Sequence, residues 1–144
     1  MKLTLRDISN AVNTISNFKQ SMHIKLSYRF SKLLSKFETE MKLIEKERKS
    51  LIEKYGVKNQ AGEFVILQDN NNLSTFIKEF DDFLNEEYTL DDSDLIPFDL
   101  IENSDLKFSP IELHNIDKLL KVKSQDNQQA NGEKKDDSTP SEHA

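Results

Sequence analysis

The chain has 144 residues, no cysteine and a formal net charge of -6, which excludes a disulfide framework and thiolate metal sites. Hydrophobic residues make up 35% of it and charged residues 32%, a balance typical of half-exposed helices rather than of a densely packed globule. No run of about 18 apolar residues occurs and the N-terminus has no signal-peptide pattern, so we expect neither a membrane span nor a secretory leader.

Charge is distributed unevenly along the chain. Residues 1 to 55 carry 12 Lys or Arg against 6 Asp or Glu, whereas residues 56 to 144 carry 8 against 20, so the first part is +6 and the second -12. Eleven carboxylates lie between Glu79 and Asp105, with no Lys or Arg among them. This polarity suggests either that the two halves attract each other or that a charged partner binds.

An N-terminal helix is predicted to begin after Thr4. Thr4 is a plausible N-cap and Asp7 an acidic group in the first turn, which together resemble a capping box. Apolar residues then recur on one helix face, at Leu5, Ile8, Val12, Ile15 and Phe18. The pattern lapses over residues 20 to 23, so a short connection there would make the next helix antiparallel to the first.

A long second helix, from about residue 26 to residue 55, is the dominant predicted element. Its apolar seam comprises Leu26, Phe30, Leu33, Phe37, Met41, Ile44, Leu51 and Tyr55. The seam is close to a heptad repeat, but the step from Phe37 to Met41 breaks the strict coiled-coil phase. About 30 residues in one helix would span roughly 45 Å. Either the helix forms a coiled-coil arm or it pairs with the first helix, and we favour the pairing.

A glycine is predicted to end this helix and another to close a turn. Gly56 follows the last periodic residue and is expected to be a left-handed C′ residue. Residues 57 to 67 predict a small β-hairpin whose turn is closed by Gly62. A loop, "QDNNN", follows over residues 68 to 72.

The remaining sequence predicts two shorter helices. Asn72 is expected to cap a third helix over residues 73 to 87, with a phenylalanine-rich apolar face. Residues 88 to 101 have strand-type residues interrupted by Pro97, so they predict at best an edge strand or an extended arm. The last helix has the clearest start, because Ser109, Pro110 and Glu112 occupy the N-cap, N1 and N3 positions.

The predicted fold is therefore mainly α with a small β-hairpin. An N-terminal helix pairs antiparallel with a long second helix, and two shorter C-terminal helices pack back on them. We expect one helical domain over residues 1 to 122. Residues 123 to 144 contain no aromatic residue and no aliphatic residue larger than alanine, so they predict a disordered polar tail.

The sequence carries no catalytic, cofactor-binding or metal-binding signature. Its histidines, His23, His114 and His143, do not share a helix face, and no H-E-x-x-H pattern occurs. The "DDSD" segment lacks the glycine turn and the distal glutamate of a calcium loop. We therefore expect a protein without cofactor or metal that is not an enzyme.

Two charged sets are candidate partner-binding residues. The basic set lies on one face of the second helix, at spacings of 4, 3 and 4, and comprises Lys25, Arg29, Lys32 and Lys36. Such a stripe could track phosphates, but the acidic total and the absence of interleaved aromatics argue against direct nucleic-acid binding. The acidic set is interpreted as a solvated face, a surface for a cationic protein, or a mimic of nucleic acid: Asp81, Asp82, Glu86, Glu87, Asp91, Asp92 and Asp94.

Several segments resemble a family of small uncharacterised proteins from phages and prophages. They are "MKLTLRDISNAVNTI", "LSYRFSKLLSKFETEMKLIEKERKSLIEKYG", "FIKEFDDFLNEEYTL" and "SPIELHNIDKLL", within residues 1 to 121. The "R-x-x-L-I-x-K-Y-G" helix end at residues 48 to 56 and "L-N-E-E" at 84 to 87 carry most of the likeness. The family has no established activity, so no functional residue is transferred. The resemblance implies a viral or prophage product in the host bacterial cytoplasm or in the virion.

These observations together predict a non-catalytic interaction protein. It would bind another phage or host protein through the long helix or the acidic segment, as an assembly or structural component or as a factor acting on the host. The alternative is an acidic decoy that imitates nucleic acid and inhibits a host enzyme that binds DNA or RNA, or a defence enzyme. The sequence leaves open whether the chain forms a homo-oligomer. We expect any functional surface to lie near Gly56, where the basic part of the sequence is followed by the acidic part.

Overall fold

The computed structural model describes residues 1–68 and 71–122. The predicted tail, residues 123–144, and part of the predicted loop, residues 69–70, lie outside the described residues. The fold is mainly α with small sheets, as predicted. The elements in chain order are β1 (Lys2–Thr4), α1 (Leu5–Ser16), α2 (Ile24–Lys36), α3 (Glu38–Tyr55), β2 (Val57–Lys58), β3 (Phe64–Val65), α4 (Asn71–Leu84), β4 (Glu87–Thr89), η1 (Asp92–Asp94), β5 (Ile96–Pro97), α5 (Phe98–Glu102), α6 (Pro110–Ile116), η2 (Asp117–Leu119) and β6 (Leu120–Lys121).

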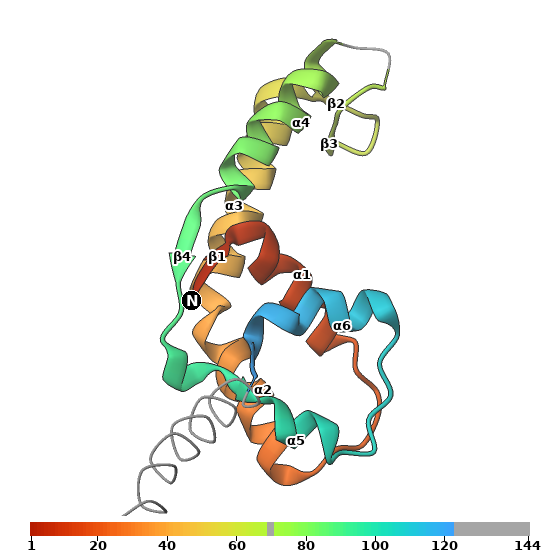
Figure 1. The fold of residues 1–144 in the computed structure, drawn as a ribbon. Helices are drawn as coiled ribbons and strands as arrows, with labels where there is room; N and C mark the ends of the chain where they lie inside the picture. The colour runs from red at the N-terminus through yellow and green to blue at the C-terminus, as the bar shows by residue number, and fades with distance from the viewer. Residues whose placement is uncertain (69–70, 123–144) are drawn as a thin grey trace, which may run out of the picture.

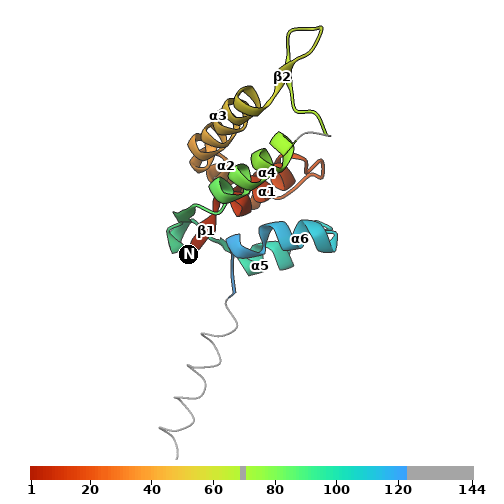
Figure 2. The ribbon, with the colours of Figure 1, turned by 90° about the horizontal axis from the view of Figure 1, so that it is seen from above.

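The molecule consists of a body and a projecting arm (Figure 1). The arm is formed by α3, the β2–β3 hairpin and α4, and the two helices run side by side in opposite directions. The body contains α1, α2, α5 and α6. Seen from above, α5 and α6 lie on the side of α1 away from α3 (Figure 2). Because α1 contacts both α3 and α6, it connects the arm to the body.

Both predicted capping boxes are confirmed. The Thr4 hydroxyl accepts a hydrogen bond from the Asp7 amide at 3.1 Å, and the Asp7 carboxylate accepts one from the Thr4 amide at 3.0 Å. Ser109 and Glu112 make the same reciprocal pair at the start of α6, with Pro110 at N1. These contacts are local, so the residues within each first turn determine them.

The predicted long second helix is in fact two helices joined at Phe37. Hydrogen bonds continue across the joint, from the Phe37 amide to the Leu33 carbonyl and from the Met41 amide to the Phe37 carbonyl, each 3.0 Å. Phe37 itself has no exposed surface and its ring meets Tyr88 edge to face, with centroids 5.7 Å apart. The bend falls where the apolar seam changes phase, because α2 faces the core of the body while α3 faces α1 and α4. The alternative prediction of one continuous helix forming a coiled-coil arm is therefore wrong.

α1 packs on α3, as predicted for the second helix, but the helix that runs alongside α3 is α4 (Figure 1). The last helix was expected to continue through Leu120, yet α6 ends at Ile116. Leu119 and Leu120 are both buried, and Leu120 pairs with Ile96 in a parallel strand contact that a continuing helix would not make. The chain instead passes through η2 into β6.

Gly56 ends α3, but the predicted left-handed conformation is wrong. Its φ of -93° and ψ of 173° are those of an extended residue. A β-carbon there would lie 2.4 Å from the Ile52 carbonyl oxygen and 2.9 Å from that of Val65. Glycine is thus required because the hairpin passes close to the helix end.

The predicted hairpin is confirmed, with Val57 opposite Val65 and Lys58 opposite Phe64. Gly62 closes its turn with a φ of 81°. Asn72 does not cap the third helix, because it lies within α4 and its side-chain amide donates to the Tyr55 carbonyl at 3.3 Å. That helix also ends at Leu84 rather than at residue 87.

Two strand pairs join segments that are far apart in the sequence. β1 pairs antiparallel with β4, with Leu3 opposite Tyr88. β5 pairs parallel with β6, with Ile96 opposite Leu120. The extended character predicted for residues 88 to 101 is therefore seen in β4 and β5, but η1 and α5 interrupt it. These pairings hold the acidic segment against the body.

Candidate functional site

The basic set of α2 lies on the flank of a helix whose inner face is buried. Leu26, Phe30 and Leu33 enter the core, so Lys25, Arg29, Lys32 and Lys36 are directed away from it. His23 caps the helix, because its Nδ1 atom accepts a hydrogen bond from the Lys25 amide at 3.2 Å. The sequence correctly placed these cations on one face.

One end of the acidic set meets this basic face within the same chain. Asp94, in η1, is only 7% exposed and is within ion-pair distance of Lys36 and, at 3.6 Å, of Lys32. The hydrogen bond from Lys36 holds the pKa of the Asp94 carboxyl below its usual value. The same bond raises the pKa of the Lys36 ammonium. Of the two explanations for the charge polarity, mutual attraction therefore applies here.

The residues around Asp94 extend this internal contact. The Arg29 guanidinium donates to the Ser93 carbonyl at 3.3 Å, and the Asp91 carboxylate accepts from the Ser93 amide at 3.2 Å. Asp92 lies 3.4 Å from the ammonium group of Met1. The "DDSD" segment is thus a turn that is held to α2 and to the N-terminal ammonium group of Met1.

The other acidic residues, on and after α4, are only partly paired. Asp81 lies 3.3 Å from Arg6 and Glu87 lies 3.7 Å from Lys2, and these side chains are largely exposed. Asp82 and Glu86 are exposed and make no ion pair within the described ranges. The acidic set is therefore not one surface, because the structure divides it between α4 and the turn at η1.

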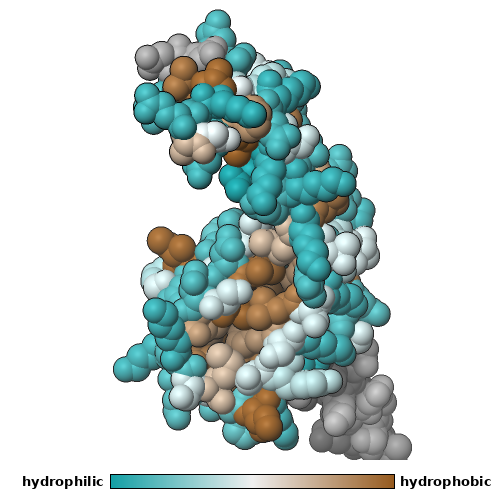
Figure 3. Space-filling model, turned by 180° about the vertical axis from the view of Figure 1, so that it is seen from behind, coloured by the Kyte–Doolittle hydropathy of each residue, from teal (hydrophilic) through white to brown (hydrophobic). Residues whose placement is uncertain are grey.

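The arm exposes apolar side chains that were not among the predicted partner-binding residues. No described side chain of α4 is buried, although the helix carries phenylalanine at positions 76, 80 and 83. Figure 3 shows apolar surface at the end of the arm and again on the body below it. We define the arm surface as the large hydrophobic residues of the arm that are 37% to 54% exposed: Leu43, Val57, Phe64, Val65, Leu67 and Ile77.

The arm surface stays open because only one helix covers each arm helix there. α4 packs on α3 and, near the body, on α1, and the Phe76 and Phe80 rings are stacked with centroids 5.8 Å apart. The end of the arm is fixed by Tyr55, whose hydroxyl lies 2.6 Å from Glu79. Uncovered apolar residues on an ordered pair of helices and its hairpin make the arm a candidate contact surface.

The remaining histidines and carboxylates form no metal site among the described residues. His114 lies on α6 beside Asp117 and Lys118 at a small pocket of about 110 Å³. Within residues 1–68 and 71–122, no group of three or more His, Cys, Asp or Glu is placed to hold a metal ion. In the same ranges, no helix is both long and apolar enough to cross a membrane.

The chain was compared with protein-family models, with curated proteins and with solved structures, and none of them matches.

Proposed function

We propose that this protein is a non-catalytic, phage-encoded factor that binds another protein, of the phage or of its host, through the arm surface. Such a factor could act in virion assembly or on a host protein. The observation that carries the proposal is the uncovered apolar surface of an otherwise ordered arm. The phage origin rests on the sequence resemblance.

The composition of the arm surface supports binding to a protein. Four of its six residues, Val57, Phe64, Val65 and Leu67, lie in the hairpin or just after it, at the end farthest from the body. Apolar residues with charged neighbours are typical of the centre and rim of protein interfaces. Lys58 supplies such a neighbour, because its ammonium lies 5.5 Å from the centre of the Phe64 ring.

The acidic decoy receives less support. A decoy needs a row of free carboxylates, yet Asp81, Glu87, Asp92 and Asp94 each lie within 4.0 Å of a cationic group of this chain. Replacing Asp82 and Glu86 by their amides separates the two functions. A decoy would lose binding with a steep salt dependence, whereas a protein bound through the arm surface would not.

The test compares two matched double variants of the tagged full chain. Val57→Ser with Ile77→Ser removes two apolar groups from the arm, at residues 47% and 49% exposed. Val122→Ser with Ile111→Ser makes the same chemical changes on the body, at residues 56% and 74% exposed. Each protein is purified from infected cells, and the co-purifying proteins are quantified by mass spectrometry.

We expect the arm variant to lose a partner that the wild type and the body variant both retain. Circular dichroism spectra should agree among the three proteins, because the changed residues are exposed. Full retention of every partner by the arm variant would refute the proposal. Sedimentation of the purified wild type shows whether the occupant of the arm surface is a second copy of the chain.

A further inference from the structure

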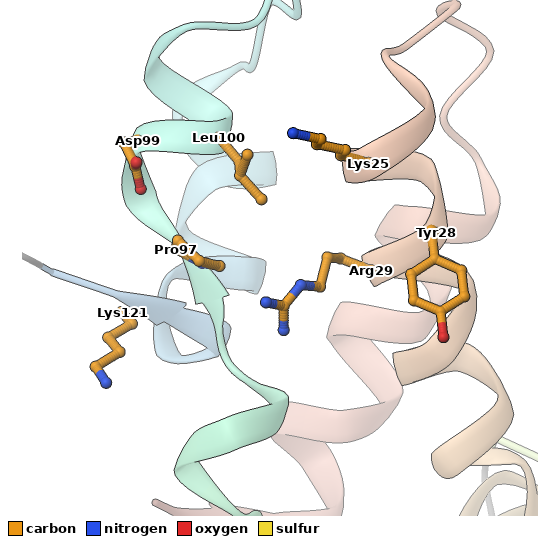
Figure 4. Close-up of a pocket in the computed structure, with 7 residues that line it drawn as sticks. All are labelled: Lys25, Tyr28, Arg29, Pro97, Asp99, Leu100 and Lys121. Carbon is orange, nitrogen blue, oxygen red and sulfur yellow. The ribbon is translucent and has the colours of Figure 1, made fainter.

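A pocket lies on the body, between α2 and α5 (Figure 4). Its volume is about 540 Å³, which is within the usual size range of ligand sites. Its wall comes from α2, from β5 and α5, and from β6: Lys25, Tyr28, Arg29, Pro97, Asp99, Leu100 and Lys121. None of these residues belongs to the arm.

The pocket has an excess of positive charge. Lys25, Arg29 and Lys121 line it together with a single carboxylate, that of Asp99. Figure 4 shows Lys25 and Arg29 extending from α2 toward α5 and Pro97, with Lys121 on the opposite side. Within the described residues, none of the three cations is within 4.0 Å of a carboxylate. This charge is therefore available to an anionic group.

Arg29 is already held in position for such a group. Its guanidinium donates one hydrogen bond to the Ser93 carbonyl, at 3.3 Å, and the strand pairing of β5 fixes the segment that follows Ser93. A guanidinium has five N–H donors, so several remain. A prepositioned arginine loses less side-chain entropy when it binds a carboxylate.

Asp99 contributes a hydrogen-bond acceptor to a pocket whose other charged groups are donors. Its Oδ1 atom is buried and has no hydrogen-bond partner among the described residues. A buried acceptor without a partner is costly, and a rotation of the Asp99 side chain that exposed this atom to the pocket would let an N–H group of a ligand satisfy it. The pocket thus combines cations for an anion with an acceptor for a nearby N–H.

Apolar side chains border the charged groups. Leu100 and Pro97 line the pocket on one side, and Tyr28, 66% exposed, lines it on the other. Ile24, 78% exposed, is one helical turn before Tyr28, so the two side chains extend the apolar edge along α2. Basic and apolar stripes therefore run in parallel on the outer face of α2.

We propose that this pocket binds an acidic peptide segment of a partner protein. The partner's carboxylates contact Lys25, Arg29 and Lys121, a backbone N–H donates to Asp99, and an apolar side chain lies against Tyr28 and Leu100. A peptide presents all three groups within a few residues. The site is separate from the arm surface, so a partner could engage either one alone.

Three probes test the proposal by NMR titration of the full-length protein. The first is a capped hexapeptide that alternates glutamate and phenylalanine. The second is the same capped peptide with glutamine in place of glutamate, and the third is adenosine monophosphate. The backbone amides of Asp99 and Leu100 and the side-chain Nε–H of Arg29 report on binding. Lys25→Glu and Lys121→Glu reverse the charge at these positions without removing a side-chain hydrogen bond seen among the described residues. Lys46→Glu, an exposed lysine of α3, is the matched control.

We expect saturable shifts with the glutamate peptide, weakened about tenfold or more by Lys25→Glu and by Lys121→Glu but not by Lys46→Glu. The arm variant with Val57→Ser and Ile77→Ser should bind this peptide as the wild type does, so failure of the arm proposal and failure of this one are distinguishable. Equal binding of the glutamine peptide, tighter binding of the nucleotide, or equal losses in all three lysine variants would overturn the proposal. Absence of saturable shifts would do so as well.

Discussion

A methyl group added at Gly56 probes how α3 ends and how the hairpin is attached to it. In Gly56→Ala the new β-carbon would lie 2.4 Å from the Ile52 carbonyl oxygen and 2.9 Å from the Val65 carbonyl oxygen. Both neighbours are backbone atoms, so relief requires movement of the helix end or of β3. The backbone angles of Gly56 itself suit alanine, and the entire penalty therefore comes from the neighbours.

The magnitude follows from two opposing terms. Overpacking of this kind costs about 1–3 kcal/mol, and replacing glycine by alanine restores about 0.4–1 kcal/mol through the unfolded chain. We expect a net loss of about 1–2 kcal/mol in the free energy of unfolding. The penalty can be relieved locally, because β2 and β3 share only two residue pairs and both strands are exposed. Displacement of the hairpin should therefore accompany the loss.

Urea unfolding followed by circular dichroism measures the loss, and hydrogen exchange of the Asn59 amide, which donates to Glu63 at 2.8 Å, reports on the hairpin. The decisive comparison is with asparagine. Gly62 has a φ of 81° and open space around it, so there Asn should be tolerated better than Ala. At Gly56, Asn should be no better than Ala. If Gly56→Asn is the milder change, the close-approach explanation fails and a left-handed helix end is correct.

Two further substitutions test the core and the buried ion pair. Phe37→Ala removes a side chain with no exposed surface and should lower the free energy of unfolding, measured in urea, by about 3–5 kcal/mol. Phe64→Ala, on the arm at 37% exposure, should lower it by less than about 1 kcal/mol. Similar losses for the two variants would show that Phe37 does not anchor the bend. Asp94→Asn should cost about 1–2 kcal/mol at neutral pH, less than a fully buried pair because both lysines reach solvent. The folded state lowers the pKa of Asp94, so its contribution is present above the unfolded pKa of about 3.8 and is lost as the pH falls through the lower folded value. Wild type and Asp94→Asn should consequently converge in stability in acid, and a constant difference from pH 7 down to pH 2 would contradict this assignment.

The features predicted correctly from the sequence are those that depend on neighbours within one or two turns. Thr4 with Asp7, Ser109 with Glu112 and the turn at Gly62 belong to this class. The phase change at Phe37 was visible as well. Whether it would bend the helix depended on what each half packs against, and no local pattern contains that information.

The missed features depend on residues far apart in the sequence. The burial of Asp94 requires η1 to reach α2, and β1 requires β4 as its partner. A strand of three residues has too little pattern to be recognised alone. The exposure of Ile77 was missed for a related reason, because its helical face was expected to be covered, yet the side chain is 49% exposed among the described residues.

The position of α1 has a consequence for the order in which the protein folds. Thr14 pairs with Asn115, 101 residues later, and Gln20 exchanges two hydrogen bonds with Lys107, 87 residues later. α3 and α4, by contrast, are joined by a short hairpin, so they can pair as soon as both have left the ribosome. α1 is made first and can pack on α3 and α4 once they form, but its apolar face is fully covered only when α6 has been made. The arm should therefore form early and the body close last, which makes the nascent N-terminal helix the segment most in need of protection from aggregation.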